Sequence, residues 1–465
     1  MAITAGGGLN PAAANPTKAA VPGNYVDLRD SGWAQQYLPD LMEKEAEVFG
    51  NRTISGFLEQ VGAEEAMAGD QVVWSEQGRL HIKESVVITT AADGLLTSAT
   101  AMKVRKGDTI VLHGLTGGGD GVTVKCYISA VAANGLTCNA LPYTEADLDT
   151  SFNSTDTATI FVYGSEYQKG TIGRAEGLES GFISYATKPV IIKDLYEVSG
   201  SDASSIGWVE VSGEEGQNGY LWYLKANGET MSRFTDYCEM ACVEGEVATG
   251  TDVLAALGAE SGTEGLFAAV RARGHITTDI VGTNHATDLT SFDNILKKFD
   301  AQGAIEENMM FVNRDVSLAV DDMLAAQNSY GAGGTSYGIF DNDENMALNL
   351  GFSGFRRGSY DFYKTDWKYL NDGQTRGALN GEDVRGVFIP AGVSSVYDQA
   401  LGKNMKRPFL HVRYRASATE SRKLKTWITG SVGAVSSDLD AMEVNYLSER
   451  CLVTQGANNF MLLTD

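Results

Sequence analysis

The stretch from Tyr220 to Val247 constrains the fold of this chain most strongly, because its pattern predicts one long amphipathic helix. Apolar residues recur there at steps of three, four or seven, namely Tyr220, Leu224, Met231, Phe234, Cys238 and Ala241. At 1.5 Å per residue the helix would be about 40 Å long, well above the three-turn average. Asn227-Gly228 weakens the pattern and indicates a bend, or a later helix start near Glu229. A β-rich sequence precedes the stretch and a mixed sequence follows it, so the helix is expected to join two unlike halves.

Length and charge limit the classes of protein to which the chain can belong. With 465 residues it exceeds one ordinary core, which predicts roughly two to four domains or large insertions. The net charge of −24 disfavours a nucleic-acid binder held by phosphate contacts, and it also disfavours anionic membrane surfaces. No run approaches the ~20 apolar residues of a membrane helix, so no membrane partner is expected. Self-repulsion at this charge favours soluble monomers until a large, specific interface overcomes it.

The N-terminal stretch has the composition of a flexible arm, and the cysteines point to a reducing compartment. From Met1 to Tyr25 the only charged side chain is Lys18, and the pattern of a signal peptide is missing. We expect a flexible arm there that orders only against a partner, followed by a helix from Pro39 to about Val48. The five cysteines lack paired CxxC spacing, which predicts free thiols in a reducing compartment. Cys238 and Cys242 are one helical turn apart, but further ligands are missing nearby, so core positions are expected.

Strand signals dominate the region before the long helix. In Gln71–Thr97, β-branched runs flank the polar Ser75–Arg79, which predicts an extended hairpin or loop lying on a neighbouring surface. Lys103–Tyr163 contains four strand candidates separated by Gly-rich turns. This spacing predicts a small barrel or sandwich inserted into the chain.

Helix and strand signals alternate after the long helix. Thr290 and Ser291 can cap a helix, Met309–Val312 has the pattern of a strand, and Asn313 can cap a further helix through Leu324. This alternation predicts an α/β domain. Further strand candidates are Pro189–Val198, Ile206–Val211, Tyr360–Tyr363, Val384–Ile389, Phe409–Tyr414, Thr426–Ile428, Ala441–Tyr446 and Cys451–Thr454.

Known catalytic and ligand-binding motifs are missing from the sequence. The histidines form no HExxH, and neither a GxxxxGK[ST] loop nor a GxSxG elbow occurs. Asp341 and Asp343 imitate a calcium loop, but Met346 and Phe352 stand where Gly and Glu are required. The sequence therefore predicts no cofactor, no metal and no enzyme. Two alternatives stay open: an enzyme with a site built from distant residues in 271–408, and a carbohydrate-binding or adhesion protein built on residues 103–163.

One segment is basic although the whole chain is acidic. Between Lys403 and Lys425 the only acid is Glu420, while the basic residues are Lys403, Lys406, Arg407, Arg413, Arg415, Arg422, Lys423 and Lys425. A contact with the acidic surface of a neighbouring subunit explains this segment better than a DNA-facing patch, which stays as the alternative. The same reasoning applies to Arg356-Arg357.

Four stretches, in their order along the chain, carry a family resemblance. They are WSEQGRLHIKES (Trp74–Ser85), PVIIKDLYEVSGS (Pro189–Ser201) followed by the long helix, the helix–strand–helix passage Phe292–Leu324, and the ending Asp440–Leu463. Together they resemble the major capsid proteins of tailed bacteriophages with the HK97-like fold. The parts of that α+β fold are called the N-arm, the E-loop, the P-domain with its spine helix, and the A-domain. The acidic, insertion-bearing form is similar to capsid proteins of crAss-like and related marine phages, whereas its length disfavours an encapsulin.

The resemblance implies a division of the chain and a function. The parts would be an N-arm with a short helix at 1–50, an E-loop region at 51–102, a β insertion domain at 103–165, a P-domain at 166–265, an A-domain at 266–405 and returning P-domain strands at 406–465. The implied function is self-assembly into the hexamers and pentamers of an icosahedral head, formed in the host bacterial cytoplasm. Implied partners are copies of the chain, a portal, decoration, head-fibre and scaffolding proteins, and packaged double-stranded DNA through weak, non-specific proximity.

The resemblance also suggests which residues contact neighbouring subunits. These are Trp74, Glu76, Arg79, His81 and Lys83 in the E-loop region, together with Arg356, Arg357, Lys406, Arg407, Arg413 and Arg415. Some family members cross-link E-loop lysines to asparagines. Lys83, Lys103 and Lys106 are available, but none can be matched with its asparagine and assisting acid, so noncovalent contacts are expected.

Overall fold

The computed structural model describes residues 56–464, all of which belong to the unit Thr53–Asp465. Residues outside the description are 1–55, 59–62, 79–80, 175–176, 178–181, 205–209, 213–217, 258–261, 279, 281–284, 304, 328–353, 380–382, 392, 399–402, 432–434 and 465. The predicted helix at Pro39, Arg79 and the calcium-like segment at Asp341 fall among them. In some elements, including residues 218–225, 285–288, 393–398 and 403–408, only the backbone is described.

One sheet is organised around the 14-residue strand β22 (Ala441–Thr454), which pairs with three other strands. The order is β1 (Ala63–Met67), β20 (Leu410–Arg415), β22 and β10 (Val190–Ser199), with β21 (Lys425–Gly430) also on β22. The two predicted strands Ala441–Tyr446 and Cys451–Thr454 are therefore parts of one continuous strand. Its length lets β22 pair with β10 over residues 441–450, with β21 over 442–447 and with β20 over 450–454.

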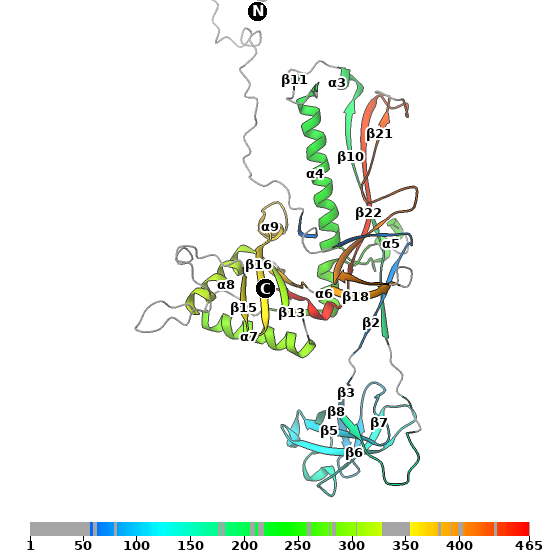
Figure 1. The fold of residues 1–465 in the computed structure, drawn as a ribbon, viewed down its shortest axis with the longest axis vertical. Coiled ribbons are helices and arrows are strands. Elements are labelled where there is room, and N and C mark those ends of the chain that lie inside the picture. Colours follow the sequence, from blue (N-terminus) through cyan, green and yellow to red (C-terminus); the bar gives the residue numbers. More distant parts are fainter. Residues whose placement is uncertain are drawn as a thin grey trace, which may run out of the picture. The chain divides into compact units, whose positions relative to one another are not determined.

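The long helix predicted from the sequence is α4 (Leu221–Glu244), which runs along β10 and β22 (Figure 1). Its fully buried Phe234 and Cys238 pack against Val444 and Tyr446 of β22. The predicted late start near Glu229 is wrong, because α4 begins at Leu221 and is continuous through Asn227-Gly228. Burial of its apolar face against the sheet outweighs the local preference of glycine, and Asn227 accepts a hydrogen bond from the Tyr446 hydroxyl.

A second, six-stranded sheet lies between two apolar layers. Its order is β13 (His275–Thr277), β23 (Met461–Leu463), β17 (Gly386–Pro390), β14 (Glu307–Val312), β16 (Tyr360–Asp366) and β15 (Gly354–Arg357). Because side chains alternate along a strand, Met310 packs with α7 (His285–Gln302) and α8 (Arg314–Gln327), whereas Phe311 packs with α6 (Leu266–Arg273). The predicted cap of α8 is confirmed, since Asn313 Oδ1 accepts a hydrogen bond of 2.9 Å from the Val316 amide. Helix α7 starts at His285, earlier than the predicted cap.

Residues 83–165 form a closed six-stranded barrel. The four strand candidates predicted in 103–163 are β5 (Asp108–Gly114), β6 (Thr123–Val131), β7 (Thr137–Pro142) and β8 (Thr157–Ser165). The barrel also contains β3 (Lys83–Thr90) and β4 (Leu95–Thr97), in the order β3-β4-β7-β6-β5-β8. The predicted start at Lys103 is thus too late, and the predicted hairpin over Gln71–Thr97 is wrong. Fully buried Ile88 and Leu96 of these strands complete the barrel core with Ile110 and Ile160.

The barrel is joined to the rest of the chain by a two-stranded ladder. Strand β2 (Val72–Gln77) precedes the barrel in the chain, β9 (Phe182–Thr187) follows it, and the two pair antiparallel. The remaining elements are α3 (Gly200–Ser204), the pair β11 (Glu210–Ser212) and β12 (Asn218–Tyr220), α5 (Thr251–Leu257), α9 (Lys368–Asn371), and the pair β18 (Val393–Asp398) and β19 (Lys403–Pro408).

Candidate functional site

Two of the predicted contact residues, Trp74 and Glu76, bind within the chain at the base of the β2–β9 ladder. The Trp74 side chain is buried, and its Nε1 donates a hydrogen bond of 2.9 Å to Glu76 Oε1. The same oxygen accepts a hydrogen bond of 2.9 Å from the amide of Gly456, which follows β22 in a left-handed conformation (φ 58°). Strand β2 is therefore fixed to the backbone at the end of β22.

Arg273, the last residue of α6, holds the same ladder from another side. Its guanidinium lies 4.4 Å from the ring centroid of Tyr185 on β9 and 5.9 Å from that of Trp74. Two hydrogen bonds of 2.7 and 3.0 Å join it to the carboxylate of Glu264. A guanidinium that is both stacked and paired in this way has a fixed orientation, so α6 positions the ladder that carries the barrel.

His81 and Lys83 lie beyond the ladder, at the entry to the barrel. Both side chains are exposed, and Lys83 begins β3 opposite Phe161 of β8. The structure does not bring these two residues together with Trp74 and Glu76 in one site. Their contact with a neighbouring subunit stays a prediction.

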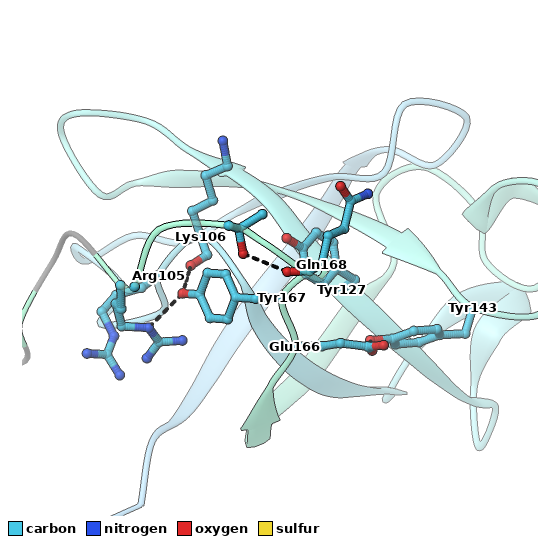
Figure 2. Close-up of a pocket in the computed structure, with 10 residues that line it drawn as sticks. Arg105, Lys106, Tyr127, Tyr143, Glu166, Tyr167 and Gln168 are labelled. Atoms are coloured by element: carbon cyan, nitrogen blue, oxygen red, sulfur yellow. Dashed lines mark hydrogen bonds between the residues drawn. The ribbon is translucent and has the colours of Figure 1, made fainter.

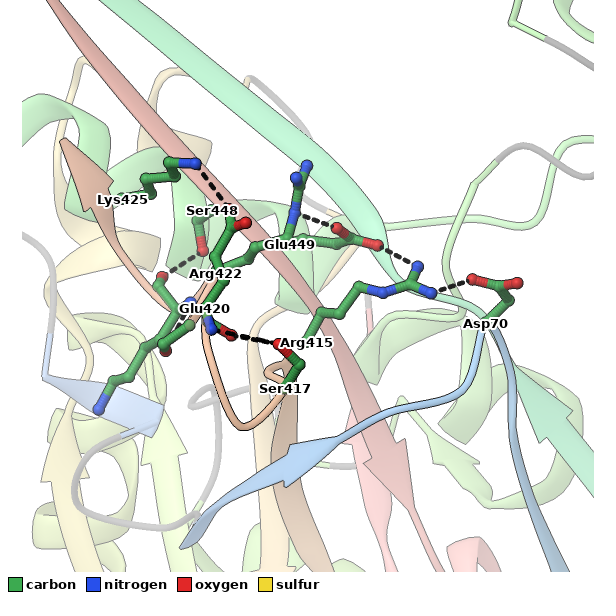
Figure 3. A network of polar contacts seen from close by, with 10 residues as sticks. Asp70, Arg415, Ser417, Glu420, Arg422, Lys425, Ser448 and Glu449 are labelled. Carbon is green, nitrogen blue, oxygen red and sulfur yellow. Dashed lines mark hydrogen bonds and ion pairs between the residues drawn. The ribbon is translucent and has the colours of Figure 1, made fainter. Parts of the chain in front are cut away.

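The basic segment is paired with acids of the same chain (Figure 3). The side chain of Glu449 on β22 is only 6% exposed. Its Oε1 accepts a hydrogen bond of 3.0 Å from Arg415 Nη1. Arg422 Nε lies 2.5 Å from its other oxygen. Arg415 also forms an ion pair with Asp70. One buried carboxylate thus binds two arginines from separate parts of the segment.

The other described basic side chains of this segment also have carboxylate partners. Glu65 of β1 pairs with Arg413 at 2.9 Å, and Glu64 pairs with Lys423. Within the segment itself, Lys425 pairs with Glu420 at 2.6 Å. Lys403, Lys406 and Arg407 belong to β19, where only the backbone is described. The described basic side chains are Arg413, Arg415, Arg422, Lys423 and Lys425. Because acids of the same chain match these five charges, the pairing disfavours the DNA-facing alternative for them.

Arg356 and Arg357 differ in their surroundings although they are adjacent in β15. Arg357 donates two hydrogen bonds, of 2.5 and 2.8 Å, to the carboxylate of Asp293 on α7. These hydrogen bonds lower the pKa of Asp293. Arg356 has a side chain that is 66% exposed and only a 3.6 Å ion pair with Asp361. Of the two, Arg356 is the residue available to a neighbouring molecule.

Sequence reasoning missed a buried carboxylate on α4. Glu239 Oε2 and Oε1 accept hydrogen bonds of 2.8 and 2.9 Å from the amides of Gly56 and Phe57. The Phe57 ring stacks on Trp367, with ring centroids 4.3 Å apart. Burial raises the pKa of Glu239. The apolar pair Phe57-Leu58 was the only local signal, and nothing in the sequence connects it with Glu239.

No family model and no curated protein matches the sequence. Solved structures do match: the capsid of the cyanophage P-SCSP1u has 9% identity, covers 95% of this chain and 96% of its own, and has a TM-score of 0.43. The structure from Gordonia phage Cozz has 10% identity and a TM-score of 0.44, and the match covers 96% of this chain and 97% of that one. The capsid of a native GTA particle has 9% identity and a TM-score of 0.40, and the match covers 94% of this chain and 98% of that one. These alignments extend over nearly the whole length of the chain.

The remaining predicted features concern metals, thiols and membranes. All five cysteines are buried free thiols, and Cys238 and Cys242 occupy the expected core positions along α4. Within the described ranges, no group of three or more His, Cys, Asp or Glu side chains is arranged to hold a metal ion. No helix in the same part of the chain has the length and apolar character that a membrane crossing requires.

Proposed function

We propose that this chain is a major capsid protein, a non-enzymatic subunit that assembles with copies of itself into an icosahedral phage head. The observation that carries the proposal is that the 24-residue helix α4 packs against the 14-residue strand β22. Phe234 and Cys238 bury the helix against that strand, so the two elements form one stiff plate. The resemblance in the sequence assigns this plate to the P-domain, where it would transmit tilt or rotation as the shell expands.

The other parts of the chain receive roles in the same proposal. Residues 1–50 would act as the N-arm, and the β2–β9 ladder would be the base of the E-loop, with the barrel as its insertion. The six-stranded sheet with α7 and α8 would form the A-domain at the centre of hexamers and pentamers. The partners would be portal, scaffolding, decoration and head-fibre proteins in the virion, after assembly in the host bacterial cytoplasm.

The charge of the subunit sets the conditions for assembly. At −24 per copy, like-charge repulsion opposes association at low salt and is screened at moderate salt. The same charge gives weak attraction to phosphate, which suits a container from which DNA must later leave. Assembly of the purified chain is therefore expected to increase with ionic strength.

The proposal is tested with the purified full-length chain by size-exclusion chromatography and negative-stain electron microscopy. The expected products at moderate salt are rings, sheets or closed shells. A stable monomer or small oligomer at every salt concentration, also with a candidate scaffolding protein added, would contradict the proposal.

A charge reversal then tests the predicted contact residue Arg356. Arg356→Glu is expected to reduce assembly and to leave the unfolding temperature of the monomer unchanged. Arg314→Glu is the matched control, because Arg314 is 62% exposed, lies in the same domain and pairs with one aspartate. Equal effects of the two substitutions would show that Arg356 has no special role.

A further inference from the structure

A hollow of about 620 Å³ opens on one face of the barrel. Tyr127 of β6 and Tyr143, which follows β7, line it together with the segment Glu166–Arg174 after β8 (Figure 2). Arg105 and Lys106, which precede β5, complete the lining. Its volume falls within the range of roughly 300–1,000 Å³ that is typical of small-molecule sites.

Three tyrosines give the hollow an aromatic lining that folding of the barrel does not require. The buried core of the barrel contains none of Tyr127, Tyr143 and Tyr167. Tyr143 and Tyr167 are 46% and 43% exposed, so large parts of both rings are open to solvent. A tyrosine ring offers a flat apolar face and loses little conformational entropy on binding a ligand.

Hydrogen bonds hold two of these rings in place before any ligand arrives. The Tyr167 hydroxyl accepts a hydrogen bond of 2.9 Å from Arg174 Nε and donates one of 3.3 Å to the Lys106 carbonyl oxygen. The Tyr143 hydroxyl donates a hydrogen bond of 2.5 Å to Glu166 Oε2. Rings fixed in this way form a preorganised surface, which lowers the free-energy cost of binding.

The charges at the hollow decide which ligand chemistry it suits. Arg174 forms an ion pair with the buried carboxylate of Asp108, and Arg105 Nε lies 3.9 Å from the same carboxylate. Aromatic rings beside basic residues also bind single-stranded nucleic acid. Here, however, the three basic side chains Arg105, Lys106 and Arg174 face the two carboxylates of Asp108 and Glu166, so the excess of positive charge at the hollow is small. A phosphate backbone would therefore be disfavoured, whereas carboxylate and amide groups such as those of Glu166 and Gln168 suit hydroxyl groups.

We propose that this hollow binds a neutral oligosaccharide. The apolar C–H faces of its sugar rings would lie on Tyr143 and Tyr167, and its hydroxyl groups would hydrogen-bond to Glu166 and Gln168. Sugar rings have this combination of an apolar face and a polar rim. The site does not depend on shell assembly, so it stands or falls independently of the proposed function.

The test uses the full-length chain and isothermal titration with maltohexaose, laminarihexaose, mannohexaose and chitohexaose, each at millimolar concentration. At least one is expected to bind. Tyr143→Ala and Tyr167→Ala should each weaken that binding about tenfold or more, because each removes a stacking face. Phe161→Ala is the matched control, since Phe161 is an equally exposed aromatic residue of β8 (47%) outside the lining of the hollow. It should leave the affinity unchanged within about twofold, and unfolding temperatures verify that the variants fold.

Three results would overturn the proposal. The first is that the folded wild-type chain binds none of the four hexasaccharides. Binding could survive both tyrosine substitutions, which would locate the ligand elsewhere. A single-stranded oligothymidylate, titrated under the same conditions, could bind while the neutral sugars do not, and the hollow would then be a nucleic-acid site.

Discussion

Phe57 and Glu239 lie 182 residues apart in the sequence, and the Phe57 amide donates a buried hydrogen bond of 2.9 Å to the Glu239 carboxylate. The amide of Gly56 donates to the other carboxylate oxygen at 2.8 Å. Stacking of Phe57 on Trp367 adds an apolar contact beside these bonds. One residue of α4 thus fixes the backbone at Gly56 and Phe57.

Glu239→Ala is expected to lower the stability of the protein by about 1–3 kcal/mol, because two amides would lose their acceptor away from water. Differential scanning calorimetry measures the effect as a lower unfolding temperature. Glu246→Ala, which changes an exposed glutamate just after α4, should cause almost no shift. If the two variants unfolded at the same temperature, the Glu239 hydrogen bonds would contribute nothing measurable.

Glu449→Gln is expected to destabilise the protein by about 2 kcal/mol. It removes the charge that the side chains of Arg415 and Arg422 share, and breaking a buried ion pair leaves its partner uncompensated. The effect stays below that of a fully buried pair because the two arginines are about 30% exposed and solvent screens them. Urea unfolding followed by circular dichroism measures it. Glu420→Gln breaks an exposed pair with Lys425, which solvent screens, and should destabilise the protein much less, so an equal or larger loss there would refute this ranking.

Arg357→Gln is expected to change how stability depends on pH. Hydrogen bonding from Arg357 lowers the pKa of Asp293 in the folded protein. The stabilisation is therefore present at pH values above the ordinary aspartate pKa of 3.8 and is lost as the pH falls through the lowered value. The variant should unfold at a lower temperature at neutral pH and lose less on acidification. Both side chains are more than a third exposed, so solvent screens the pair and the change in unfolding temperature is expected to be small.

Unfolding temperatures measured between neutral and acidic pH test this expectation. Arg356→Gln is the control, because its pair with Asp361 is longer and more exposed. Wild-type and Arg357→Gln curves that ran parallel over the whole range would argue against a linkage between Asp293 and folding.

The thiols should react very slowly in the native protein. Burial raises the pKa of Cys126, Cys138, Cys242 and Cys451 to about 12, and it also raises that of Cys238. Little thiolate is then present at mildly alkaline pH, and thiolate is the form that attacks a disulfide reagent. Titration with Ellman's reagent should detect all five thiols promptly only after denaturation in guanidinium chloride. A thiol that reacts at once in the native protein would show that its side chain is accessible.

Local patterns were enough to predict several elements of the fold. The spacing of Phe234 and Cys238 predicted the face by which α4 packs, and Asn313 predicted the start of α8. Four of the six barrel strands followed from β-branched runs between glycine turns. These features depend on neighbours within a few residues, which a single sequence displays directly.

Tertiary structure decided every pairing between distant segments. Strand β2 pairs with β9 although all the barrel strands lie between them in the sequence. No local pattern in either strand predicts its partner. In the sequence the basic segment has almost no acidic neighbours. In the folded chain Glu64 and Glu65 of β1 and Glu449 of β22 form ion pairs with it. The sequence by itself therefore determined the long helix, several further helices and strands, and the acidic charge. Which strands pair, which charges are matched and which tyrosines share a hollow depend on contacts between residues far apart in the chain, and only the folded chain brings them together.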